Sequence, residues 1–375
     1  MTLAPRTTEA FDDLLTALTD VRDRYVQGAE RAHDELEAVE GFRYALQLLS
    51  EATELCAEGD PERPRFTSMV DANRKFLGDN PDAIYYQARI RGDRAYRVRG
   101  RVDGQSYLSF TVHGADPAGG INGPIQADVN DSDIALAPDG SFELILSADE
   151  RAGNWVRLQP DSRFVFVRNY FLRTRSAQTD PDVHVYLEID PLDDPGPAPV
   201  LDDETYASRL RDATALLRAG TVGLRVFGAP PAVQVPFVGT EPNTVGTPWS
   251  FRATNVDAAG GVDIFYSSGT FDLATDEALI MEGTIPPSRF TNVMLWNVHM
   301  QTLEYRSRQS SLNSAQIARE PDGTYRIVIS ATDPGVPNWI DTEGHRRGTI
   351  FWRFVLPEEQ PETPRCKVVP VSSLQ

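Results

Sequence analysis

An internal repeat is the feature that most constrains the fold of this 375-residue chain. Residues 139–171 contain a turn, an apolar run, an Asn-Trp pair and a final aromatic segment with one Arg. Residues 322–354 repeat this order at an offset of 183 to 185. Upstream, residues 92–100 align with residues 275–283 at an offset of 183. Because self-similarity at a fixed spacing marks a duplicated structural unit, we expect two copies of one module.

The local pattern of each copy predicts antiparallel β-structure. Runs such as 96–102 and 106–112 alternate apolar and polar residues, as strands with one buried face do. Asp-Gly opens the repeated strand in both copies and is a specific turn signal, since both residues tolerate positive φ. Many short strands must pack on a second sheet or close on themselves. The expected fold class is therefore mainly β, with two tandem jelly-roll or β-sandwich modules.

Helices are expected outside the two modules. Between residues 8 and 58, apolar residues recur at three- and four-residue steps, and Gly28 and Gly41 favour two or three amphipathic helices over one. Asp202 or Asp203 begins a second helical stretch that ends at Gly220. These helices are expected to form an arm packed on the body and a helical linker.

The domain boundaries follow from these changes of pattern. We expect a helical N-terminal arm (1–65), a first β-sandwich module (66–195), a connector with a helix (196–245) and a second β-sandwich module with a C-terminal tail (246–375). The Pro- and Glu-rich stretch 357–364 is expected to be an exposed tail that ends the last strand.

Composition narrows the choice of partners and compartment. With 36 Lys and Arg against 55 Asp and Glu, the formal charge of −19 disfavours nucleic acid and anionic membranes as partners. No run approaches the roughly 20 apolar residues of a membrane span. The two cysteines, Cys56 and Cys366, show no disulfide framework or metal spacing, so a cytoplasmic location is expected.

Two short motifs carry a resemblance to known families. Asn80-Pro81-Asp82-Ala83-Ile84-Tyr85 resembles the Asn-x-Asp-Thr-x-Tyr strand entry of the bacterial domain of unknown function 1254, with Ala83 in place of Thr. The segments from Asn-Trp to the Arg-bearing strand, 154–171 and 338–354, resemble the domain of unknown function 1214, which usually accompanies it. The resemblance covers roughly residues 66–370. It implies a double jelly-roll fold, often in trimers, and brings no established reaction.

The segment 79–89 is the first candidate binding surface. It concentrates polar and aromatic side chains, and alternation along a strand would place every second one on a common face that hydrogen-bonds and stacks on a sugar or small organic acid. The candidate ligand-binding residues of this segment are Asn80, Tyr85, Tyr86 and Arg89. The alternative is a structural one, in which Asn80 or Asp82 forms an Asx turn that starts the strand.

The equivalent positions of the two copies supply the second set of candidates. Trp155 and Trp339 follow an Asn in each copy, which favours a structural duty in which the Asn ties a loop and the Trp plugs a sandwich end, over a binding platform. Arg168 and Arg353 lie on the final strand of each copy. Either one would suit bidentate binding of a carboxylate, because the planar guanidinium matches its geometry.

Catalytic candidates are sparse. His113 and His299 are the better acid–base candidates among five histidines, and Asp82 and Glu304 are the carboxylates to test for glycosidase-like chemistry. None of the histidines has metal-ligand spacing, and P-loop, nucleophile-elbow and dinucleotide motifs do not occur. We therefore expect neither metal nor cofactor.

Two functions remain open on the sequence. One is a metal-independent hydrolase that binds a carbohydrate or small organic substrate in a cleft at the modules. The other is a non-catalytic ligand-binding or assembly protein of double jelly-roll type. A homo-oligomer, most simply a closed trimer, is the expected assembly.

Overall fold

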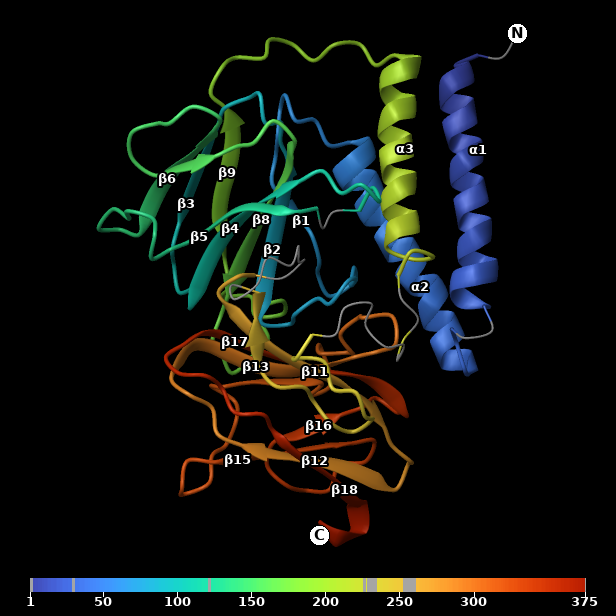
Figure 1. The fold of residues 1–375 in the computed structure, drawn as a ribbon, viewed down its shortest axis with the longest axis vertical. Coiled ribbons are helices and arrows are strands. Elements are labelled where there is room, and N and C mark those ends of the chain that lie inside the picture. Colours follow the sequence, from blue (N-terminus) through green and yellow to red (C-terminus); the bar gives the residue numbers. More distant parts are fainter. Residues whose placement is uncertain are drawn as a thin grey trace.

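The computed structural model describes residues 3–28, 31–120, 123–224, 227, 235–251 and 261–374. Its strands form four sheets in two modules that follow one another along the long axis of the molecule, and three long helices flank the first module (Figure 1). The predicted fold class, two duplicated β-sandwich modules with an N-terminal helical arm and a helical linker, is confirmed.

The first module pairs a five-stranded sheet with a four-stranded sheet. The five-stranded sheet has the order β1-β2-β8-β4-β5, and the four-stranded sheet has the order β7-β6-β3-β9. The strands are β1 (Thr67–Ser68), β2 (Ala83–Arg89), β3 (Tyr96–Arg101), β4 (Tyr107–Gly114), β5 (Ile125–Asn130), β6 (Ser141–Ser147), β7 (Trp155–Arg157), β8 (Ser162–Tyr170) and β9 (Tyr186–Pro191).

The second module repeats this arrangement. Its sheets have the orders β10-β11-β17-β13-β14 and β16-β15-β12-β18. The strands are β10 (Trp249–Ser250), β11 (Ile264–Asp272), β12 (Glu277–Gly283), β13 (Ser288–Trp296), β14 (Ser311–Asn313), β15 (Tyr325–Ser330), β16 (Trp339–Asp341), β17 (Arg347–Pro357) and β18 (Arg365–Pro370), followed by a short 3₁₀ turn at Val371–Ser373.

A glycine that faces an aromatic residue occurs at the same position in both copies. Gly100 on β3 lies opposite Phe142, and Gly283 on β12 lies opposite Tyr325, each across an antiparallel pair. A Cβ on Gly100 would meet the Phe142 ring at 2.5 Å, and one on Gly283 would meet the Tyr325 hydroxyl at 2.9 Å and its ring at 3.3 Å. The aromatic ring therefore covers the bare backbone of the glycine in both sandwiches.

Two expectations about the strands are wrong. The modules are not wholly antiparallel, because β7 pairs in parallel with β6 and β16 in parallel with β15, after a loop that carries the chain back along the sheet. The stretch 357–364 is not a terminal tail either. It leads from β17 to β18, which pairs with β12 as β9 pairs with β3 in the first copy. The stretch therefore carries the chain from one sheet of the second module to the other.

The helices are α1 (Pro5–Asp20), α2 (Glu35–Ala52) and α3 (Asp203–Ala219), with π-helical turns at Val21–Val26 and Thr53–Ala57. Asp34 and Asp202 begin α2 and α3 by accepting a hydrogen bond from the third backbone N–H that follows each of them. The predicted interval from Asp202 to Gly220 is confirmed. Gly41 does not interrupt a helix as expected; it lies inside α2, where a Cβ would be only 3.0 Å from the His299 ring.

Burial explains how the parts are held together. Val165 and Val167 on β8 face the core of the first sandwich, whereas Phe164 and Phe166 face the helices. A further apolar cluster joins the two modules and includes Tyr170 and Tyr266. The outer face of the first five-stranded sheet is therefore covered partly by the helical arm and partly by the second module. None of the helices in the described part of the chain is long and apolar enough to cross a membrane.

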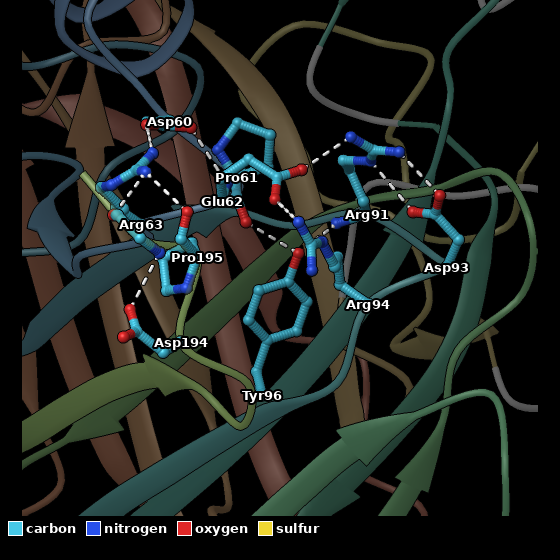
Figure 2. Close-up of polar contacts among 11 residues, drawn as sticks. Asp60, Pro61, Glu62, Arg63, Arg91, Asp93, Arg94, Tyr96, Asp194 and Pro195 are labelled. Atoms are coloured by element: carbon cyan, nitrogen blue, oxygen red, sulfur yellow. Dashed lines mark hydrogen bonds and ion pairs between the residues drawn. The ribbon is translucent and has the colours of Figure 1, made fainter. Parts of the chain in front are cut away.

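The exit of the helical arm is fixed by a polar network (Figure 2). The Tyr96 hydroxyl donates to the Pro61 carbonyl at 2.9 Å, and Glu62 accepts from Arg91 and Arg94. Arg63 reaches the carbonyl of Pro195 at 3.2 Å in the connector beyond β9. The segment after α2 is thus tied both to the β2–β3 turn and to the chain that leads into α3.

Candidate functional site

A cavity of about 610 Å³ lies where the helical arm and both modules meet. Its lining residues come from the arm, from β2 and β8 of the first module and from β11, β13 and β17 of the second. This volume is within the range of pockets that hold small organic ligands, roughly 300–1,000 Å³. The cavity is the candidate site.

The walls of the cavity are mainly aromatic and aliphatic. The aromatic lining residues include Tyr85, Phe166, Tyr170, Tyr266, Trp296 and Phe351. Trp296 and Phe351 stack with centroids 4.2 Å apart, and the Tyr85 hydroxyl donates to that of Tyr170 at 3.3 Å. Burial raises the pKa of Tyr85 well above its ordinary value, so its phenol stays neutral.

Each module contributes a tyrosine–arginine pair to the cavity. Tyr85 on β2 is the register partner of Arg168 on β8, and Tyr266 on β11 is the register partner of Arg353 on β17. Since paired residues of adjacent strands point to the same face of a sheet, both side chains of each pair face outward from their own sandwich. The duplication therefore directs two guanidinium groups into one cavity.

Arg168 is buried, with 8% of its surface exposed. It donates to the Thr111 hydroxyl, and among the described residues no carboxylate oxygen lies within 4 Å of it. Burial lowers the pKa of Arg168 and the nearby carboxylate of Asp128 raises it, with a net increase. Burial in turn raises the pKa of Asp128 to about 6. Arg168 is thus a buried cation without a direct ion pair in the described part of the protein.

Arg353 is equally buried, with 6% exposed. It donates to the Gly78 carbonyl at 2.8 Å and to Met294 Sδ at 3.0 Å, and its guanidinium lies 4.8 Å from the Phe351 ring centroid. Ring faces attract cations, yet they do not neutralise charge. Within the described ranges Arg353 also has no carboxylate within 4 Å.

A reciprocal pair of hydrogen bonds fixes the two modules against each other beside the cavity. Asp82 of the first module accepts from Asn313 of the second at 3.1 Å, and Asp263 of the second accepts from Asn130 of the first at 2.7 Å. Asn130 and Asn313 end equivalent strands, β5 and β14. The contact thus has approximate two-fold symmetry, which brings the two tyrosine–arginine pairs to the same place.

The Asn80–Asp82 motif serves this contact rather than the cavity. The Asp82 N–H donates to Asn80 Oδ1 at 3.0 Å, which is the Asx turn that was the structural alternative. Asn292 donates to both residues, to Asn80 at 2.8 Å and Asp82 at 3.0 Å. Burial raises the pKa of Asp82 to about 6, while the hydrogen bonds from Asn292 and Asn313 oppose the shift. Neither Asn80 nor Asp82 lines the cavity.

His299 is the one proposed catalytic residue that lines the cavity. Its Nε2 lies 2.8 Å from the Glu37 carbonyl, and its Nδ1 lies 3.0 Å from the Tyr25 hydroxyl. Because a carbonyl only accepts, Nε2 carries the proton and Nδ1 accepts from Tyr25. Burial lowers the pKa of His299, which keeps the ring neutral near pH 7.

The other two catalytic candidates lie elsewhere. Glu304 is paired with Arg306 at 2.6 Å, and that hydrogen-bonded guanidinium lowers the pKa of Glu304 to about 2. His113 is buried beside Phe166, with Nδ1 2.8 Å from the Gly123 carbonyl, and burial lowers its pKa to about 4. Neither Glu304 nor His113 is among the cavity residues.

The candidate residues of the segment 79–89 that lie on β2 have two different environments. Tyr85 and Tyr86 line the cavity. Farther along the strand, Gln87 donates to Glu51 on α2, and Arg89 pairs with Asp212 on α3 at 2.9 Å. The helices therefore satisfy the polar groups at the end of the strand, and Arg89 does not line the cavity.

The Asn-Trp pairs make the same contacts in both copies. Asn154 donates to the carbonyls of Ala135 and Glu143, and Asn338 donates to those of Ala318 and Arg326. The indole N–H of Trp155 donates to Ser147 and that of Trp339 to Ser330. Neither indole lines the cavity. The loop-tying role expected for the Asn is observed in each sandwich.

Several cavity residues were not anticipated from the sequence, including Tyr25, Tyr170, Tyr266 and Trp296. Tyr266 corresponds to Tyr85 only in strand register, opposite Arg353 as Tyr85 lies opposite Arg168, because it stands 181 positions after Tyr85, outside the 183 to 185 spacing of the repeat. Tyr25 had no sequence signal either, because helix periodicity identifies a buried face without its neighbours. In the described part of the chain, no group of three or more His, Cys, Asp and Glu residues could hold a metal ion.

Comparisons with known proteins agree with the duplicated architecture. The family described as "Protein of unknown function (DUF1214)" matches twice, at residues 82–172 and 270–359. A putative uncharacterized protein from Burkholderia cenocepacia, of known crystal structure, is 31% identical with a TM-score of 0.83, covering 99% of this chain and 100% of that one. This chain belongs to the same family as that protein, and it contains two DUF1214 domains.

A more distant structure shares only the fold. The VPA0106 protein from Vibrio parahaemolyticus is 13% identical with a TM-score of 0.52, covering 88% of this chain and 98% of that one. No curated protein matches the sequence.

Proposed function

We propose that the protein binds a small, largely apolar organic molecule in the cavity between its two modules. The observation that carries this proposal is a cavity of about 610 Å³ lined mainly by aromatic and aliphatic side chains from three separate parts of the chain. Apolar walls with a few directed polar groups are typical of small-molecule sites. The cavity wall therefore favours a small organic ligand over a carbohydrate, whose many hydroxyl groups would need more hydrogen-bond partners than the walls provide.

A cavity-filling substitution tests this proposal. Ser268 lines the cavity on the same strand as Tyr266, and Ser268→Trp would occupy part of its volume. Thr16→Trp adds the same side chain on an exposed face of α1 and is the matched control. We expect thermal-shift stabilisation of the wild type and Thr16→Trp by members of a panel of apolar organic compounds, and none for Ser268→Trp. Equal stabilisation of all three proteins would place binding outside the cavity.

Hydrolysis of the bound molecule is the second proposed function, and the Tyr25–His299 pair favours it. A neutral imidazole that borders the cavity, with an unprotonated Nδ1 that accepts a hydrogen bond from Tyr25, has the free base form that a general base needs. Turnover of ester and glycoside panels tests the proposal, with His299→Gln as the variant and Asp82→Asn as the control for loss of the inter-module contact. Hydrolysis by His299→Gln at the wild-type rate would exclude His299 from the reaction.

Assembly and location are proposals as well. The resemblance to the paired domains of unknown function 1254 and 1214 supports a homotrimer. The 1254 part of this resemblance rests on the Asn80 motif. The sequence, with only two cysteines, supports a cytoplasmic location. Both cysteines are free thiols, Cys56 buried and Cys366 half-buried.

A further inference from the structure

We infer that the molecule bound in the cavity is an aromatic carboxylate whose single carboxylate group is held jointly by Arg168 and Arg353. This inference rests on the proposed function and specifies its ligand class. Three observations support it: neither arginine forms a direct ion pair with a described residue, the two arginines are related by the internal two-fold, and flat aromatic surfaces lie beside them.

The charge of the arginines indicates an anion. A guanidinium has five N–H donors, of which Arg168 uses one on Thr111 and Arg353 uses two on Gly78 and Met294. Both side chains line the cavity and neither has an ion pair among the described residues. Buried charges in proteins are normally paired, and planar forks of N–H donors match carboxylate oxygens. A ligand carboxylate would supply the missing partner.

The symmetry of the contact indicates one shared group rather than two separate ones. Arg168 and Arg353 lie on the equivalent strands β8 and β17 and line the same cavity. Each is paired across its sheet with a tyrosine. Both guanidinium groups act on the same two phenols: each opposes the burial that raises the pKa of Tyr85 and of Tyr266. The two cations thus share one neighbourhood, where one carboxylate can offer an oxygen to each.

The body of the ligand follows from the surfaces beside the arginines. Trp296 and Phe351 stack at an interplanar angle of 26°, and the Arg353 guanidinium lies over both rings, 5.4 and 4.8 Å from their centroids. Tyr266 lies against Phe351 at 5.6 Å. Offset stacking and edge contacts favour a flat ring system over a flexible chain.

Calorimetric titration with matched probes tests the inference. Naphthoate, naphthamide and naphthylmethanol share one body and differ in the polar group, whereas decanoate keeps the carboxylate on a flexible chain. The variants are Arg168→Met, Arg353→Met and the double variant. Arg163→Met is the control, because Arg163 lies on the same strand as Arg168 but pairs with Asp212 at 2.7 Å. Arg168→Lys and Arg353→Lys retain the charge if a Met variant does not fold.

We expect the wild type to bind naphthoate at least ~10-fold more tightly than naphthamide or naphthylmethanol, as a charge-assisted hydrogen bond implies. Arg168→Met and Arg353→Met should each bind naphthoate ~10-fold more weakly than the wild type and bind the two neutral probes unchanged. Arg163→Met should bind naphthoate as tightly as the wild type. Without ligand, Arg168→Met and Arg353→Met should melt no lower than the wild type, which a merely structural arginine would not allow.

Three results would overturn the inference. Equal affinity of the wild type for naphthoate and naphthamide would exclude the carboxylate, and loss of affinity in only one arginine variant would exclude the shared group. Tighter binding of decanoate than of naphthoate would exclude the aromatic body. In each case apolar ligands still bind and the proposed function stands. If no probe binds and Ser268→Trp responds to the wider compound panel as the wild type does, the proposed function itself fails.

Discussion

Replacing Asn338 by alanine should destabilise the second module strongly, because this side chain fixes a loop from within. Its amide donates to two carbonyls, at 2.7 Å to Ala318 and 3.1 Å to Arg326, and its oxygen accepts from the Ala318 N–H at 2.7 Å. Asn338 is 9% exposed and has a φ of 58°, in the left-handed region. Both the lost hydrogen bonds and the backbone conformation should contribute.

The expected magnitude can be divided between these two causes. Three hydrogen bonds at about 1 kcal/mol each contribute about 3 kcal/mol. Alanine in a left-handed conformation adds about 1 kcal/mol that asparagine largely avoids. Asn338→Ala should therefore lower the free energy of unfolding by about 4 kcal/mol. Asn338→Gly, which tolerates positive φ, should lower it by about 3 kcal/mol.

The first copy supplies the matched comparison. Asn154 makes the same three hydrogen bonds to its own loop and has no positive φ, so Asn154→Ala should lose the hydrogen-bond part alone. The assay is urea unfolding of the whole chain, followed by circular dichroism and tryptophan fluorescence. A decrease of less than about 0.5 kcal/mol in the free energy of unfolding of both alanine variants would refute a loop-tying role for the motif. Equal results for Asn338→Ala and Asn338→Gly would refute the conformational part.

Three further predictions concern pH, packing and assembly. Burial raises the pKa of Glu51 to about 8, although Arg74 lies 3.5 Å away. The contribution of the protonated Glu51 carboxyl to the free energy of unfolding is therefore complete below pH ~4.5 and is lost as the pH rises through about 8. Glu51→Gln should remove this pH dependence in urea unfolding, and an unchanged pH dependence would assign it to other groups. Gly41→Leu should displace α2 from His299 and increase amide exchange in α2, whereas unchanged exchange would mean that the neighbours yield. Light scattering should give about three times the 41.5 kDa chain mass, and a single-chain mass at micromolar concentrations would exclude the oligomer.

The repeat in the sequence predicted most of the fold, because a duplicated pattern states the same structure twice. The repeat located the Asp-Gly turns, the Asn-Trp loops and the Arg-bearing strands β8 and β17 of the two copies. The last strand, β18, was missed because the residues before it are rich in Pro and Glu, a composition that also occurs in tails. Its pairing with β12 matches the pairing of β9 with β3, so a search for the counterpart of β9 would have found it.

The site was only partly predictable, because it depends on which sheet faces cover each other. Arg168, Arg353, Tyr85 and Tyr86 were candidates and line the cavity. The strand pattern gives the periodicity of a face, but it does not say whether helices, solvent or a second module will cover it. Asp82 shows the difference, since its Asx turn is local whereas its partner Asn313 lies 231 positions away.

A crystal structure of the protein with bound naphthoate would show directly whether the two arginines share one carboxylate. We expect density for the naphthalene ring between the two modules, with one carboxylate oxygen within hydrogen-bond distance of each of Arg168 and Arg353. A molecule bound outside the cavity, or one whose carboxylate points away from both arginines, would contradict this expectation.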